Sequence, residues 1–63
     1  MDAEQATSAV KERYPRIKAG RWSAERNGPD WEVRHRYAGR RAPTVEVYVC
    51  PDGSMEDVDG NPV

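Results

Sequence analysis

The chain has 63 residues, of which 37% are hydrophobic and 33% are charged, and its formal net charge at pH 7 is −1. A chain of this length forms one domain at most and buries only about 60% of its unfolded surface, so we expect marginal stability. The single cysteine excludes an internal disulfide and a four-cysteine zinc site, and no apolar run approaches the length of a membrane span. We therefore expect one domain over residues 1–63, with no cofactor, no metal and no membrane insertion. A cytoplasmic location is expected from the chain as it stands, with a mature exported protein as the alternative.

The charges are distributed unevenly along the chain. All ten basic residues lie between Lys11 and Arg41, whereas acidic residues are concentrated in the first twelve positions and in Asp52–Asp59. This segregation predicts that the folded molecule has a basic region and an acidic region.

The segment "DAEQATSAVKERYP" has the pattern of an amphipathic helix. Its apolar side chains recur every three or four residues, which places them on one stripe of a helix: Ala3, Ala6, Val10 and Tyr14. Asp2 is suited to cap the first turn, with Gln5 at the capping-box position. Pro15 is expected to end the helix, because proline disfavours helical geometry in the residue before it.

The next segment, "RIKAGRWSAER", predicts a strand whose phase is ambiguous. Ile17 and Trp22 are the residues that gain most from burial, but strict alternation would place them on opposite faces. A bulge near Ala19–Gly20 would reconcile them, because glycine is common where a strand contains an extra residue.

Two further strands are predicted after the turn "NGPD". In "WEVRHRY" the core face carries Trp31, Val33, His35 and Tyr37, and in "TVEVYV" it carries Val45, Val47 and Val49. Short turns between the strands require antiparallel neighbours. We therefore predict an α+β fold in which one N-terminal helix packs on a three-stranded antiparallel β-meander (α-β-β-β). Residues 51–63 are expected to form a turn and a loosely held acidic tail.

The order of these elements resembles a PepSY domain. The resemblance is carried by the helix that ends in "YP", the stretch "NGPDWEVRHRY" and the last strand "VEVYVCPDGSMEDV", and it covers roughly residues 3 to 58. The chain departs from the family pattern at Cys50, where that family usually has an acidic residue, and in the charged turn "YAGRRAPT". The resemblance implies a small non-enzymatic module that binds or restrains a peptidase or another protein.

No catalytic arrangement can be assembled from the sequence. Cys50 and His35 are the only candidates for a nucleophile and a base, and alternation from Val49 places Cys50 on the face opposite His35. We expect Cys50 to behave as a small hydrophobic residue, and His35 to be a partly buried ring between Val33 and Tyr37. These features predict that the protein is not an enzyme.

Neither the acidic segment nor the tryptophans indicates a site. The acidic residues from Asp52 to Asp59 do not have the spacing of a calcium loop, and a solvated tail explains them. Trp22 and Trp31 are expected in the core rather than at a recognition surface, since the chain has no phenylalanine.

The predicted outer face of the sheet carries the candidate partner-binding residues. They are basic or aromatic: Arg34, Arg36, Arg40, Arg41 and Tyr48. Lys18 or Arg21 on the first strand could extend the patch, which would suit an acidic protein or a phosphate backbone. Cross-strand pairing with Glu32 and Glu46 on a solvated sheet explains the same residues without a partner.

The function predicted from the sequence is a small protein-binding module of inhibitory or regulatory type. The partner is another protein, with a peptidase as the class that the resemblance implies. A small nucleic-acid-binding protein that uses the basic face is the alternative. The valine-rich edge strand Thr44–Val49 also predicts a homodimer formed by strand pairing.

Overall fold

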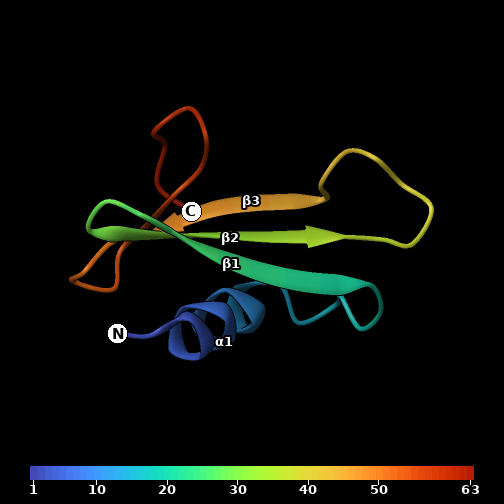
Figure 1. Ribbon diagram of the computed structural model, residues 1–63, viewed down its shortest axis with the longest axis horizontal. Coiled ribbons are helices and arrows are strands. Elements are labelled where there is room, and N and C mark those ends of the chain that lie inside the picture. The colour runs from blue at the N-terminus through green and yellow to red at the C-terminus, as the bar shows by residue number, and fades with distance from the viewer.

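The computed structural model describes residues 1–63 and contains one helix and a four-stranded sheet. The elements are α1 (Ala3–Arg13), β1 (Arg21–Asn27), β2 (Asp30–Arg36), β3 (Val45–Val49) and β4 (Met55–Glu56). The strands lie in the sheet in chain order, and each is antiparallel to its neighbour. α1 covers one face of the sheet (Figure 1), and it is neither long nor apolar enough to cross a membrane. The predicted α+β class and the helix packed on a meander are confirmed.

The helix begins and ends where its capping residues predict. The Asp2 carboxylate accepts a hydrogen bond from the Gln5 amide, and the Gln5 side chain accepts one from the Asp2 amide, which completes a capping box. Tyr14 is the C-cap, directly before Pro15. Ala6 and Val10 are fully buried against the sheet, so the predicted apolar stripe is the face that α1 presents to the core.

The first strand begins later than predicted and contains no bulge. β1 pairs with β2 in unbroken register from Arg21 to Asn27. Gly20 has a φ of 94°, a conformation that favours glycine, and it forms the corner that precedes the strand. Ile17 packs against the core from the connection that follows α1, so it needs no place on the strand. The expected bulge near Ala19–Gly20 is wrong, because the two apolar residues belong to different elements.

The core lies between α1 and the inner face of the sheet. Its buried members are mostly valines: Ala6, Val10, Val33, Val45, Val47, Val49 and Met55. Trp22 and Trp31 are partly buried and pack against this cluster, as predicted. Tyr37, which alternation assigned to the core face, follows the end of β2 and remains 40% exposed.

His35 is fully buried on the core face of β2. Its ring lies between those of Trp22 and Tyr37, with centroids 4.9 Å and 4.7 Å away, rather than between Val33 and Tyr37 as expected. His35 Nε2 lies 2.6 Å from the carbonyl oxygen of Ala19. A carbonyl oxygen only accepts, so Nε2 carries the proton and donates. Nδ1 has no hydrogen-bond partner.

The last thirteen residues are mostly exposed, but Met55 and Val63 attach them to the domain, whereas the sequence predicted a loosely held tail. Met55 in β4 is buried and pairs with Val49. Val63 packs on the core, and its amide donates to the Met55 carbonyl while its carbonyl accepts from Arg13. The Asp57 carboxylate accepts hydrogen bonds from two amides within the final turn. These contacts hold the segment where composition alone suggested a solvated tail.

The fourth strand also changes the edge that was expected to pair with a second copy. β4 pairs with Tyr48 and Val49, so these residues are no longer at an edge. Only residues 44–47 remain without a neighbouring strand on that side. Homodimer formation through this edge stays a prediction, now limited to the first four residues of the proposed strand.

Candidate functional site

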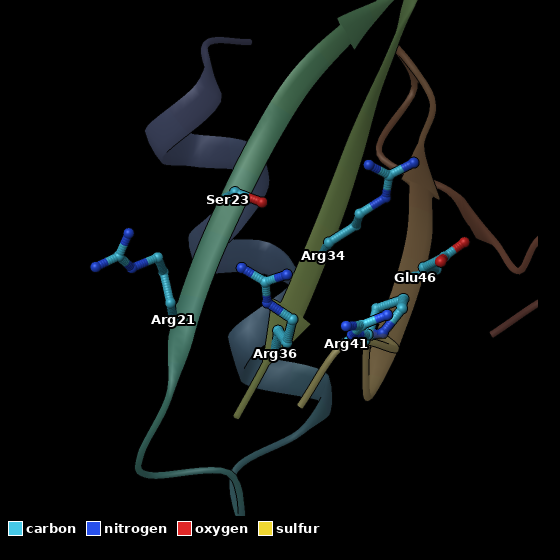
Figure 2. Close-up of a pocket in the computed structure, with 7 residues that line it drawn as sticks. Arg21, Ser23, Arg34, Arg36, Arg41 and Glu46 are labelled. Atoms are coloured by element: carbon cyan, nitrogen blue, oxygen red, sulfur yellow. The ribbon is translucent and has the colours of Figure 1, made fainter. Parts of the chain in front are cut away.

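The outer face of the sheet, which lies away from α1, is built from alternate residues of β1, β2 and β3. Its most basic part is a shallow hollow of about 270 Å³, which we call the basic groove. The groove is lined by Arg21, Ser23, Arg34, Arg36, Arg41, Pro43 and Glu46. Figure 2 shows Arg34 and Arg36 rising from β2, Arg21 on the neighbouring β1 and Arg41 coming from the β2–β3 loop.

The register of the strands brings like charges together in the groove. Arg21 lies directly opposite Arg36 on the paired strands, and Ser23 lies opposite Arg34. Like charges in directly opposite positions destabilise a sheet. The fold therefore carries an unfavourable interaction at this place, which an anion bound between the two side chains would relieve.

Few carboxylates neutralise these arginines. The only ion pair in the molecule joins Arg34 Nη2 to Glu32 Oε1 at 2.8 Å, along a single strand. Glu46 lies opposite Arg34 in the register but forms no ion pair with it. Cross-strand pairing, which the sequence offered as an explanation without a partner, is absent. Arg21, Arg36 and Arg41 therefore have no carboxylate partner within the protein.

The opposite end of the outer face is acidic. Glu25 lies across from Glu32, and Tyr48 lies across from both Glu32 and Glu56. A hydrogen bond to Glu32, together with partial burial and the nearby Glu32 and Glu46 charges, raises the pKa of Tyr48. We call Glu25, Glu32 and Glu56 the acidic end. The outer face is thus divided along the strands into a basic half and an acidic half.

The structure brings together only some of the predicted partner-binding residues. Arg34, Arg36 and Arg41 line one groove, whereas Arg40 faces a separate hollow beside Tyr37 and Thr44. Tyr48 lies beside the acidic end, opposite Glu32, and does not line the groove. Arg40 is separate because the β2–β3 loop turns it toward the second hollow. Tyr48 is separate because the register places it beside Glu32.

Sequence reasoning missed Ser23 and gave Arg21 only as one of two choices. Both sit on the outer face because β1 starts after the Gly20 corner and then alternates without interruption. Alternation would have identified both, because they are the immediate neighbours of Trp22, which was expected on the core face. The uncertain phase at Ala19–Gly20 concealed that signal.

The other chemically interesting residues are far apart. His35 pairs with Val45 at the start of β3, whereas Cys50 follows Val49 at the end of that strand. No group of three or more histidine, cysteine, aspartate or glutamate side chains is arranged to hold a metal ion. In the β3–β4 turn, hydrogen bonds from the Ser54 hydroxyl and amide lower the pKa of Asp52, and they serve to shape that turn.

Comparison with protein-family models, with curated proteins and with solved structures found no match. The resemblance to PepSY domains therefore stays a prediction from the sequence, and the geometry of the outer face carries the functional argument.

Proposed function

We propose that this protein is a non-enzymatic binding module that holds an acidic segment of another protein against the basic groove. The observation that supports it is the presence of three arginines, Arg21, Arg36 and Arg41, that share a groove and lack a carboxylate partner. Arginine is favoured at protein interfaces because its planar guanidinium group pairs with carboxylates through two parallel hydrogen bonds. The resemblance to PepSY domains supports the same class of function and makes a peptidase one candidate partner.

A nucleic acid is the second candidate, favoured by the same arginines. The acidic end of the outer face argues against it, because a polyanion that follows the strands would leave the basic groove and meet Glu25 and Glu32. This repulsion limits the length of the anionic chain that the outer face can accept. A short acidic segment suits the groove better than a continuous phosphate backbone.

The two candidates differ in how binding depends on salt. The test uses a fluorescent peptide that has one short glutamate-rich segment between neutral residues and a single-stranded oligonucleotide of equal length, with binding followed by anisotropy over a range of salt concentrations. A nucleic-acid binder loses affinity steeply with salt, because each phosphate that is neutralised releases counterions. We expect tighter binding to the peptide, and the reverse order would favour the nucleic-acid function.

Replacing Arg34 and Arg36 together with alanine locates the contact. We expect peptide binding to weaken by more than about 1 kcal/mol, because arginines at an interface often dominate its energy. The free energy of unfolding should change little, since exposed charges contribute little to folding. Val47→Ala should do the reverse, keeping affinity and lowering stability by about 2 kcal/mol, because Val47 is only 1% exposed.

A matched control removes the same charge elsewhere. Lys11 and Arg16 are exposed and lie outside the sheet, so Lys11→Ala with Arg16→Ala lowers the net charge equally without touching the groove. If both double variants weaken peptide binding to the same extent, the effect is one of net charge and the groove is not the binding site.

A further inference from the structure

We propose that the basic groove recognises a phosphoryl group, carried as phosphoserine or phosphothreonine on the acidic segment of the partner. The inference rests on the proposed function and names the chemical group that the groove selects. It follows from the charge, the donors and the lining of the groove.

The density of positive charge in the groove exceeds what one carboxylate can neutralise. Four arginines and one glutamate line it, and three of the arginines have no ion-pair partner. Two carboxylates brought to the same point would repel each other. A phosphoryl monoester places a charge of about −1.5 to −2 and three strong acceptor oxygens on one phosphorus atom. This group matches the groove because it concentrates its charge where the arginines are concentrated.

The donors of the groove also suit a phosphoryl group. The guanidinium groups come from separate elements and point in different directions: Arg21 from β1, Arg36 from β2 and Arg41 from the β2–β3 loop (Figure 2). Guanidinium groups bind phosphate oxygens through paired hydrogen bonds, and a tetrahedral anion offers oxygens in several directions. Ser23, opposite Arg34, adds a neutral hydroxyl to the same lining. A planar carboxylate offers two oxygens to these donors, fewer than the three of a phosphoryl group.

The lining further indicates that charge, and not an apolar side chain, is recognised. None of the seven residues around the groove is hydrophobic, so no pocket is present for an aliphatic or aromatic side chain of the partner. The acidic end, which begins at Glu32 on the same strand as Arg34 and Arg36, discourages a chain of successive phosphates. The arrangement therefore suits one doubly charged group rather than a polynucleotide.

The test compares three short peptides of identical acidic sequence that carry phosphoserine, glutamate or serine at one position. Binding to the full chain is measured by calorimetry at one salt concentration. We expect the phosphoserine peptide to bind about tenfold more tightly than the glutamate peptide, which corresponds to about 1.4 kcal/mol. The serine peptide should bind more weakly than either.

Variants of Arg36 connect the selectivity to the groove. Arg36→Lys keeps the charge but removes the paired donors, so it should reduce the preference for phosphoserine over glutamate, and Arg36→Ala should abolish it. Lys11→Ala, at an exposed position of α1 outside the groove, should leave the preference unchanged. Thermal unfolding of each variant verifies that the fold is retained.

The outcomes separate this inference from the proposed function. Equal binding of the phosphoserine and glutamate peptides overturns the inference and leaves the proposed function intact. Absence of binding by all three overturns both. If an oligonucleotide of the same charge binds more tightly than the phosphoserine peptide, the groove recognises phosphodiesters and the inference is wrong.

Discussion

At the scale of single residues, His35 and Gly20 fix the position of Arg21 in the basic groove. The only hydrogen bond of the buried His35 ring is to the carbonyl of Ala19, which precedes the Gly20 corner. A Cβ atom at Gly20 would meet His35 Nε2 and would lie 2.8 Å from the carbonyl oxygen of Arg36. The corner at Gly20 is therefore closely packed. β1 can begin at Arg21 only if this corner keeps its conformation.

Gly20→Ala should accordingly be among the most damaging substitutions at a glycine. We expect it to lower the free energy of unfolding by more than about 2 kcal/mol, because strained backbone and steric overlap combine. Gly39 is the matched control, since its φ is also positive, at 78°, but no atom lies near a Cβ there. Gly39→Ala should cost about 1 kcal/mol. If urea denaturation gives the same loss in free energy of unfolding for Gly20→Ala and Gly39→Ala, the packing of the corner has no role in stability.

Tyr48 offers a prediction about pH. Its raised pKa, caused first by the hydrogen bond to Glu32, means that the folded state favours the neutral phenol. The stabilisation is complete below the unfolded pKa of about 10 and is lost as the pH rises through the higher folded value. In Glu32→Gln, the Tyr48 pKa measured by NMR titration should fall. Glu25→Gln is the control, and a Tyr48 pKa that is unchanged by Glu32→Gln would exclude Glu32 as the cause.

At the scale of elements, β4 completes the core. Met55 is 7% exposed and covers the end of β3, and the Val63 amide donates to its carbonyl. Met55 and Val63 therefore attach the C-terminal segment both to β3 and to the core. The acidic segment is thus part of the fold.

Met55→Ala should therefore lower the free energy of unfolding by about 2 kcal/mol, through a cavity beneath β4. Val58 is the control, because it is 56% exposed, and Val58→Ala should change stability by less than about 0.5 kcal/mol. Urea denaturation measures both. If the two variants are equally stable, residues 55–63 contribute nothing to the core.

The sequence predicts α1, β2 and β3 well, because their periodic patterns are complete, whereas the start and phase of β1 stayed uncertain. The capping box at Asp2 and Gln5 and the alternating valines of β3 are purely local signals. β4 was missed because a strand of two residues shows no alternation, and only its partner strand defines it. The members of the basic groove depend on where β1 starts, which the Gly20 corner determines through its contact with His35. No local pattern reveals that contact.

At the scale of the whole molecule, the net charge of −1 conceals a strong separation of charge. The outer face has the basic groove at one end and the acidic end at the other, and α1 covers the inner face (Figure 1). Under the proposed function, this separation would orient a ligand as well as bind it, with its negative group toward Arg21, Arg36 and Arg41. Such an orientation is useful to a module that must hold one segment of a partner in a fixed register.

The most direct test of the account is an NMR titration of the arginine side chains with the phosphoserine peptide. The Nε–H signals report each guanidinium group separately. We expect those of Arg21, Arg34, Arg36 and Arg41 to shift, because these side chains line the basic groove. The signals of Arg13 and Arg26 should stay in place, since these side chains bind the carbonyls of Val63 and Gly28 away from the groove. Shifts at Arg13 and Arg26, with none at the four groove arginines, would contradict the proposal that the outer face is the binding surface.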